Sequence, residues 1–290
     1  MFQRCVFADA VVEADEAEYA ILGLPFDSTA SFRSGSRGGP DAVRQASYNF
    51  EPYDYRNQVD LLDVGICDLG NLDLGSDPAL AWQAIRDSFS FIPHRAVPIF
   101  IGGEHSVTPP LVELMMRDGD VGVLVLDAHL DLRDEYGGTR MSHACASRRI
   151  LDLSPPGYAC MGIRSGSREE FDYAADLGLT CVTSDQVAEQ GIDALLDRAL
   201  ELLGDRIYLS IDFDVLDPAY APAVGNPEPF GLSPREVRRV VERVAPRAVA
   251  LDVTEISPVH DQGQTALLGA RLIRDFVAAR ARSRLPRALK

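Results

Sequence analysis

Short apolar runs alternate with longer helical patterns along this chain, and this alternation restricts the possible folds more than any other feature. The apolar runs lie at residues 19–24, 97–101, 121–126, 207–211 and 249–253. Helical periodicity occurs at residues 79–91, 111–117, 192–203, 234–244 and 266–280. Buried strands that alternate with helices form a parallel sheet covered on both faces. We therefore predict a single α/β domain over residues 1–290, with a mostly parallel central sheet flanked by helices.

Acidic residues and histidines follow several predicted strands directly. The run 121–126 leads into Asp127, His129 and Asp131, whose side chains point the same way because side chains alternate along extended backbone. The other strand ends carry similar groups, namely Asp212 and Asp214 after 207–211, Glu104 and His105 after 97–101, and Glu255 after 249–253. Ligand sites of parallel sheets lie at the carboxyl ends of the strands. We therefore expect these side chains to meet in one site.

The composition of this set indicates metal ions. Packed carboxylates repel one another unless cations neutralise them. The aspartates at positions 127, 131, 212 and 214 carry four negative charges, and His105 and His129 would bind as neutral imidazoles, so two divalent ions balance the set. Oxygen and nitrogen ligands without thiolate favour manganese, iron, cobalt or nickel. Two such ions lower the pKa of a shared water molecule, which predicts metal-assisted hydrolysis.

Composition excludes several other classes of function. The net charge of −16 disfavours nucleic acid and anionic membranes as partners, because both are polyanions. No apolar run reaches the ~18 residues of a membrane span. The 5 cysteines are scattered without a C-x-x-C pair, which is typical of reduced thiols. Acidic residues near the start stand where an export signal needs an apolar core, so we expect a cytoplasmic protein.

Three motifs resemble those of the ureohydrolase family, which includes arginase and agmatinase. They are GGEHS at residues 102–106, DAHLD at 127–131 and SIDFDVLDP at 210–218, and they occur in the family's order. The resemblance extends from about residue 25 to residue 273, and the segments DAHLDLRDEY, GIRSGSREE and GNPEPFGL are most similar to agmatinases. It implies a three-layer arginase-like fold and hydrolysis of a guanidino compound to urea and an amine.

The resemblance also implies roles for individual residues. One Mn²⁺ ion would be bound by His105, Asp127, Asp131 and Asp212, and the other by Asp127, His129, Asp212 and Asp214. Glu255 would pair with the substrate guanidinium, since a planar cation suits a bidentate carboxylate. His143 would lie at the substrate and relay protons, and Asp131 would accept a hydrogen bond from the nucleophile.

The resemblance leaves the substrate open. The segment after the DAHLD motif lacks the asparagine and serine arrangement with which arginases hold an α-amino acid. Agmatine, which yields putrescine and urea, is therefore the expected small cationic substrate. Asp134 or Glu135 would attract its distal ammonium, whereas Arg133 would favour guanidinobutyrate. Asn226 and Phe230 stand near the expected substrate entrance, where agmatinase-like relatives more often have threonine and glycine.

Other interpretations stay open from the sequence. Aminopropylagmatine is a second cationic substrate, and formiminoglutamate would need basic anchors such as Arg133 and Arg164. An inactive metal-binding regulatory homologue belongs to another class of protein, and the complete ligand set together with His143 and Glu255 disfavours it. The family commonly forms trimers or hexamers, which is the basis for expecting a homo-oligomer.

Overall fold

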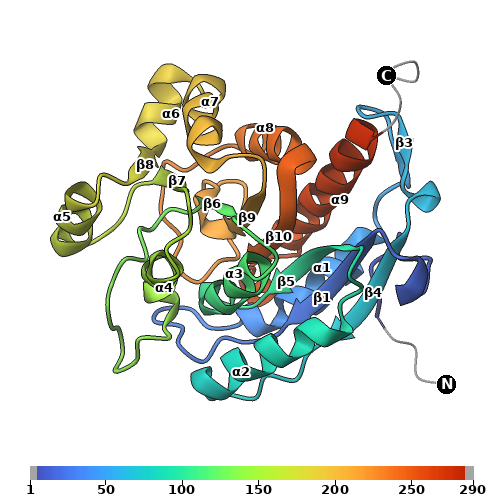
Figure 1. The fold of residues 1–290 in the computed structure, drawn as a ribbon, viewed down its shortest axis with the longest axis horizontal. Coiled ribbons are helices and arrows are strands. Elements are labelled where there is room, and N and C mark those ends of the chain that lie inside the picture. Colours follow the sequence, from blue (N-terminus) through green and yellow to red (C-terminus); the bar gives the residue numbers. More distant parts are fainter. Residues whose placement is uncertain (1–4, 285–290) are drawn as a thin grey trace.

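The computed structural model describes residues 5–284, and a parallel sheet forms its centre (Figure 1). Within these residues the sheet has eight strands in the order β4-β1-β5-β10-β9-β6-β7-β8. The strands are β1 (Tyr19–Leu24), β4 (Ile66–Asn71), β5 (Val97–Gly102), β6 (Gly122–Leu126), β7 (Tyr158–Ile163), β8 (Thr180–Thr183), β9 (Ile207–Asp212) and β10 (Ala248–Thr254). A separate antiparallel pair consists of β2 (Tyr53–Asp54) and β3 (Val59–Asp60). The predicted fold class is confirmed.

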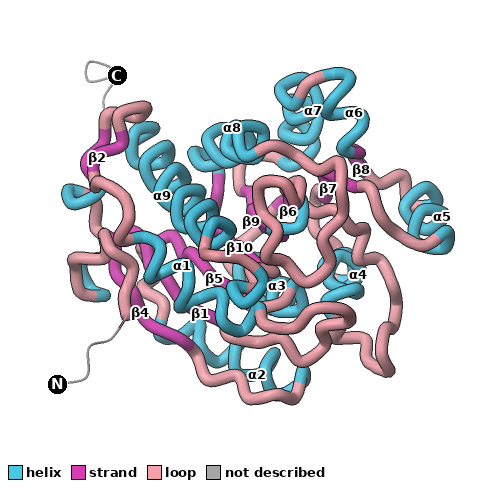
Figure 2. The backbone as a smooth tube through the Cα atoms, turned by 180° about the vertical axis from the view of Figure 1, so that it is seen from behind, coloured by secondary structure: helices cyan, strands magenta, loops and turns pink. Residues whose placement is uncertain are grey.

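Helices cover both faces of this sheet. They are α1 (Gly39–Ser47), α2 (Pro78–Ser88), α3 (Thr108–Met116), α4 (Ala146–Asp152), α5 (Arg168–Asp176), α6 (Ser184–Gln190), α7 (Ile192–Leu203), α8 (Pro234–Val244) and α9 (Gln264–Arg284). One layer contains α1, α9, α8 and α7 in lateral contact, and the other contains α2, α3 and α4. Figure 2 shows α1 and α9 in front of the strands, whereas Figure 1 shows α2 and α3 on the near side.

Alternation of side chains along the strands produces a hydrophobic core on each face. In β5, Ile99 and Ile101 pack in the core that contains α7, α8 and α9, whereas Phe100 packs in the core that contains α2 and α3. All three side chains are buried. Because both faces are covered, the central strands are apolar at nearly every position, and this made them recognisable in the sequence.

Local sequence signals fix where the helices begin. At the start of α8, Ser233 Oγ accepts a hydrogen bond from the backbone N–H of Glu236, and the Glu236 carboxylate accepts one from the N–H of Ser233 at 2.7 Å. This capping box satisfies two backbone donors that a helix start would leave unpaired. Both α7 and α8 have the predicted bounds, and the other three predicted helices are present with shifted ends.

Three strands of the central sheet were not predicted from the sequence, nor was the pair β2 and β3. In β7, Ala159, Cys160 and Gly162 interrupt the apolar run with small side chains, and the edge strand β4 contains Asp68. The edge strand β8 has only four residues, and one of them is buried. Short or edge strands need less hydrophobicity, so the apolar pattern fails to mark them.

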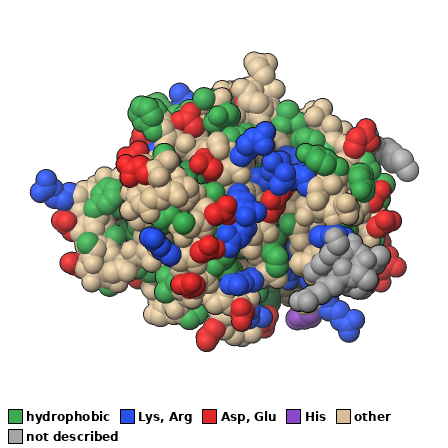
Figure 3. Space-filling view, turned by 90° about the horizontal axis from the view of Figure 1, so that it is seen from above, with side chains coloured by type: hydrophobic (Ala, Val, Ile, Leu, Met, Phe, Trp, Pro, Cys, Tyr) green, Lys and Arg blue, Asp and Glu red, His purple; other side chains and the backbone are tan. Residues whose placement is uncertain are grey.

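The outer surface shows how the acidic chain distributes its charge. Arginines and carboxylates intermix on the face drawn in Figure 3, which views the molecule from the side of α7 and α8. Between these helices, Arg239 Nε lies 2.7 Å from Asp193 Oδ1, and Arg243 Nη1 lies 3.2 Å from the same oxygen. Among the described residues, no helix combines the length and hydrophobicity that crossing a membrane requires.

Candidate metal centre

The four strands that precede the predicted ligands are neighbours at the centre of the sheet, in the order β5-β10-β9-β6. Because the strands are parallel, their carboxyl ends meet at one edge. His105 follows β5, Glu255 follows β10, Asp212 ends β9 and Asp127 follows β6. The sheet topology therefore brings together groups that lie up to 150 residues apart in the chain.

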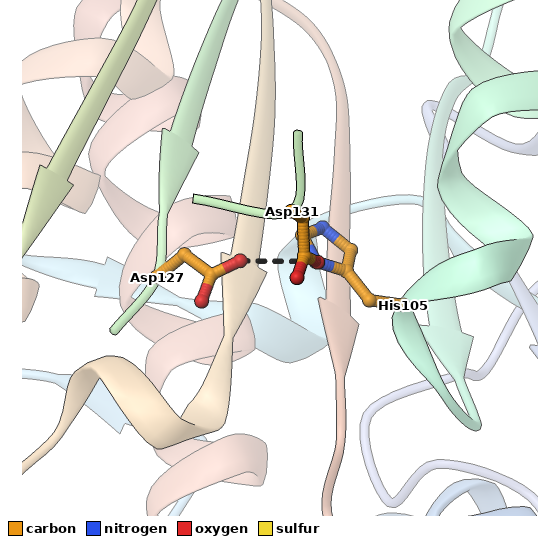
Figure 4. Close-up of side chains that lie close together, drawn as sticks. All are labelled: His105, Asp127 and Asp131. Atoms are coloured by element: carbon orange, nitrogen blue, oxygen red, sulfur yellow. Dashed lines mark hydrogen bonds and ion pairs between the residues drawn. The ribbon is translucent and has the colours of Figure 1, made fainter. Parts of the chain in front are cut away.

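The first cluster of possible metal ligands surrounds the His105 imidazole. Its Nδ1 lies 3.0 Å from Asp131 Oδ2, 3.1 Å from Asp127 Oδ2 and 3.4 Å from Asp212 Oδ2. Figure 4 shows His105, Asp127 and Asp131 converging from the ends of different strands. These three residues form a group whose ligand atoms are close enough to hold one ion.

The second cluster shares Asp127 with the first. His129 Nδ1 lies 2.9 Å from Asp214 Oδ2 and 3.7 Å from Asp127 Oδ1. Asp127, His129 and Asp214 form another group that fits one ion. Two adjacent groups with a common carboxylate are the arrangement that a pair of bridged divalent ions requires.

Backbone hydrogen bonds hold one oxygen of each central aspartate. Asp127 Oδ1 accepts from His129 N at 2.6 Å, Asp212 Oδ1 accepts from Asp214 N at 2.9 Å, and Asp214 Oδ1 accepts from Ala128 N at 3.1 Å. In each aspartate the other oxygen, Oδ2, is directed toward a histidine of the site. The buried Asp127 Oδ2 receives no well-oriented hydrogen bond from any described residue. An orphaned, fully buried carboxylate oxygen is unfavourable unless a cation binds it, so the donor set fits divalent metal ions.

The pKa values of this set reflect its crowding. Burial and the charge of Asp127 raise the pKa of Asp131 to about 7. Burial, together with the charges of Asp214 and Asp127, raises the pKa of Asp212 well above its usual range. Burial lowers the pKa of His129, but the charges and hydrogen bonds of Asp214 and Asp127 together outweigh burial and raise the pKa. Each shift retains protons in a site with excess carboxylates, and bound cations would displace those protons.

Glu255 closes the site from the end of β10. Its Oε1 accepts a hydrogen bond from His105 N at 2.8 Å, and burial and the charge of Glu104 raise its pKa well above its usual range. Both Glu255 (φ 64°) and Asp131 (φ 51°) adopt the left-handed backbone conformation. This conformation is costly for residues other than glycine, and such strain concentrates at functional sites.

A hydrogen-bond chain orients His143. Thr29 Oγ1 donates its hydrogen to Glu104 Oε1 at 2.6 Å and accepts from His143 N at 3.0 Å. Thr29 Oγ1 also lies 3.2 Å from His143 Nδ1. Because the hydroxyl has one hydrogen, Nδ1 must donate, which leaves Nε2 as the acceptor, 3.3 Å from Ser31 Oγ. Burial and the charges of His105 and His129 lower the pKa of His143 to about 4, so the imidazole is neutral and Nε2 is an acceptor.

A cavity of about 320 Å³ lies over the site. The predicted residues that line it are His129, Asp131, His143, Asp212, Asp214 and Glu255, while His105 and Asp127 are buried beneath. Arg133 also lines the cavity, but Asp134 and Glu135 do not. Asp134 is instead an exposed residue whose Oδ1 accepts from Arg149 at 2.7 Å and Arg140 at 2.9 Å.

The sequence analysis missed two carboxylates in the cavity wall, Glu170 and Glu228. Glu170 belongs to the capping box of α5, and its Oε2 accepts from Ser167 N at 2.9 Å. The Ser-x-x-Glu spacing at 167–170 was a signal for this helix start, although not for a place in the cavity. Glu228 lies in a loop without regular structure, and no periodic pattern marks it.

Arg164 holds the loop that carries Glu228. Its guanidinium donates to six backbone carbonyls, those of Gly162, Asp214, Val215, Leu216, Glu228 and Pro229. Its shortest hydrogen bonds are 2.6 Å to Asp214 O and 2.8 Å to Glu228 O. Because its donors are used in this way, Arg164 has a structural role. The sequence had left open that Arg164 anchors an anionic substrate, and these contacts argue against that role.

Comparison with known proteins agrees with this geometry. The family model described as the arginase family matches residues 17–279. An agmatinase of Pyrococcus horikoshii is 38% identical over 277 residues, covering 93% of this chain and 95% of the relative. An N(1)-aminopropylagmatine ureohydrolase of Thermococcus kodakarensis is 34% identical and covers 94% of each chain. The solved structure of an agmatine ureohydrolase of Thermoplasma volcanium matches with a TM-score of 0.89 and 40% identity, covering 97% of this chain and 96% of that one.

Proposed function

The chain belongs to the arginase family, since the family model spans residues 17–279, and from this premise we propose that it hydrolyses agmatine to putrescine and urea. One observation carries the proposal: two ligand clusters share Asp127 at the floor of a cavity that also contains Glu255. The relatives named agmatinase and agmatine ureohydrolase, at 38% and 40% identity, support a guanidino substrate of this kind.

Two divalent ions would be bound by the residues of the two clusters together with Asp212. His105, Asp127, Asp131 and Asp212 would bind one ion, and Asp127, His129, Asp212 and Asp214 would bind the other. Such ions lower the pKa of a water molecule and thereby supply a nucleophile at neutral pH. The ligands admit manganese, iron, cobalt or nickel, and we propose Mn²⁺ because the resemblance to the family implies it.

The side chains around the cavity then have distinct tasks. Glu255 pairs with the guanidinium and positions its central carbon. Asp131, at the floor, accepts a hydrogen bond from the nucleophile and passes on its proton. His143 exchanges protons with the departing amine through Nε2, the nitrogen that accepts because Nδ1 donates to Thr29.

Charges in the cavity wall support a cationic substrate over an anionic one. Arg164 is occupied by backbone carbonyls, and Arg133 Nε lies 3.5 Å from Glu170 Oε2. Neither arginine therefore offers an unpaired charge to guanidinobutyrate or formiminoglutamate. Aminopropylagmatine, a longer cationic guanidino compound, is the second candidate, and the relative of Thermococcus kodakarensis that is named for it supports this alternative.

We also propose a single cytoplasmic domain over residues 1–290 that assembles as a homo-oligomer, a trimer or hexamer, and serves polyamine synthesis. Scattering and ultracentrifugation of the purified protein would measure the assembly. The assembly and the pathway rest on the family alone, the domain and the location rest on the sequence, and the reaction rests on the geometry of the site.

The test is urea release from agmatine, aminopropylagmatine, guanidinobutyrate and arginine by manganese-loaded protein. We expect agmatine to have the highest kcat/KM. The Glu255→Gln variant should retain its metal ions but lose urea release, because it loses the charge that pairs with the guanidinium. The absence of urea from all four compounds, with two ions bound per chain, would overturn the proposed reaction.

A further inference from the structure

Besides the proposed metal ligands, Glu255 and His143, the cavity wall contains three more charged side chains. They are Arg133, Glu170 and Glu228. A guanidino substrate whose reactive end lies at Glu255 extends its other end into the cavity lined by these groups. We call the end of the substrate opposite the guanidino group its tail. The charge that remains unpaired among the three side chains therefore decides which kind of tail the cavity binds.

Arg133 and Glu170 neutralise each other. Arg133 Nε lies 3.5 Å from Glu170 Oε2, and its guanidinium lies 5.2 Å from the centre of the Tyr136 ring. Glu170 is buried and also accepts hydrogen bonds from Leu132 N at 3.0 Å and Ser167 N at 2.9 Å. This pair is part of the wall, with each charge already matched, so it offers no net charge to a ligand.

The negative charge of Glu228 is not matched by the pair of Arg133 and Glu170. Within residues 5–284 its side chain has one ion-pair contact, with His129 Nε2 at 3.8 Å, and it is 38% exposed. This distance is too long for a hydrogen bond. His129 Nδ1 lies 2.9 Å from Asp214 Oδ2, so this imidazole pairs with Asp214 and leaves the Glu228 carboxylate without a close ion-pair partner among the described residues.

The backbone around Glu228 is fixed in place although the loop lacks regular structure. Arg164 donates to Glu228 O at 2.8 Å and to Pro229 O at 3.0 Å. Asp217 Oδ2 accepts a hydrogen bond from Gly231 N at 3.0 Å. A carboxylate on an anchored backbone loses less entropy on binding than one on a free loop, so it is suited to select a ligand.

We propose that Glu228 binds the distal ammonium of the substrate and selects guanidino compounds that have a cationic tail. This inference rests on the proposed function, because it takes the guanidinium end to lie at Glu255. The two carboxylates line one cavity and match the two positive ends of agmatine. The same carboxylate repels the anionic tail of guanidinobutyrate.

The test compares Glu228→Gln with the wild type and with Glu135→Gln as the matched control. Glu135 is an exposed glutamate outside the cavity, so its variant should behave like the wild type. Calorimetry on the manganese-loaded proteins, each carrying His143→Gln to slow turnover, would measure the Kd of agmatine and of n-butylguanidine, which lacks the ammonium. KM and kcat for both compounds would be measured alongside.

We expect Glu228→Gln to reduce the preference for agmatine over n-butylguanidine by about tenfold, the size of one partly exposed charged contact. The change should appear in Kd and KM more than in kcat, and guanidinobutyrate should bind better. The metal content should stay at the wild-type value.

Two results would overturn the inference. An unchanged preference in Glu228→Gln would mean that another group binds the tail, and loss of metal ions would mean that Glu228 serves to orient His129. Binding separates the inference from the proposed reaction. If the wild type bound agmatine without releasing urea, and Glu228→Gln still lost the preference, the reaction would be wrong and the role of Glu228 would stand.

Discussion

Two buried groups of charged side chains in this molecule differ in how their charges balance. Beside β4, the fully buried Arg44 binds Asp68 through two contacts of 2.8 Å and donates to Gly70 O at 2.9 Å. Asp68 also accepts hydrogen bonds from Phe7 N and Gly70 N. One positive charge meets one negative charge, and the polar atoms of the pair are satisfied.

The group at the carboxyl ends of β5, β6, β9 and β10 is not balanced in this way. Five carboxylates, those of Asp127, Asp131, Asp212, Asp214 and Glu255, face the imidazoles of His105 and His129. Asp127 Oδ2 lacks a well-oriented partner among the described residues. A buried group that balances itself contributes to stability, whereas one that needs added cations indicates a binding site. This contrast leads to three predictions.

The largest effect is expected for Asp127→Asn. Loss of the shared carboxylate should leave fewer than two ions bound, and urea release should fall by roughly a thousandfold or more, the scale of losing one electrostatic element of an active site. The metal-free variant should also be less stable than the metal-free wild type, since the hydrogen bonds and charges of His105 and His129 outweigh burial and hold the pKa of Asp127 below its usual range. Elemental analysis, urea assay and urea denaturation measure the three quantities. Two tightly bound ions with normal turnover would contradict the assignment.

Arg44→Met should lower stability without lowering activity. Removing this guanidinium leaves Asp68 buried and unpaired, which costs about 3–5 kcal/mol of stability. The kcat per folded molecule should stay the same because Arg44 lies outside the cavity. The control is Arg56→Met, which removes an exposed pair with Glu242 at 2.9 Å and should cost less than about 1 kcal/mol. Equal losses of unfolding free energy in the two variants would mean that burial of an ion pair does not change its contribution to stability.

His143 belongs to neither group, and its protonation should have the smallest of the three effects. Its ordinary pKa of 6.5 falls to about 4 in the folded protein, mainly through burial. Between these values the unfolded chain binds more protons, so stability decreases as the pH falls. The loss between pH 7 and pH 5 should be about 2 kcal/mol. Chemical denaturation of wild type and His143→Gln at both pH values isolates this contribution, and an identical pH dependence of the two would refute it.

The floor of the site could be predicted because its residues obey a local rule. Asp127, His129 and Asp131 follow a strand that is apolar at every position, and this position marked them in the sequence, although Asp131 reaches the site through a left-handed backbone conformation (φ 51°) and not through alternation in extended backbone. Parallel pairing then brought in His105, Asp212 and Glu255 from neighbouring strand ends. Every residue in this set was identified from its position after a strand.

The wall of the cavity could not be predicted in the same way. Glu170 reaches the cavity through the N-terminal cap of α5, and Glu228 reaches it through contacts that Arg164 makes with loop carbonyls. These contacts join residues 64 positions apart and involve backbone atoms, which have no sequence signature. The proximity of Asp134 to the DAHLD motif was misleading, because Arg149 and Arg140 hold its side chain outside the cavity.

The way Arg164 holds the loop at Glu228 and Pro229 has an evolutionary consequence. Its guanidinium recognises only main-chain oxygens at Glu228 and Pro229, and every amino acid supplies such an oxygen. Mutations at residue 228 can therefore exchange the side chain in the cavity wall while the loop keeps its path beside the turn at Asp214. A descendant of this enzyme could acquire a new substrate by single substitutions there, without first losing the architecture that performs the hydrolysis.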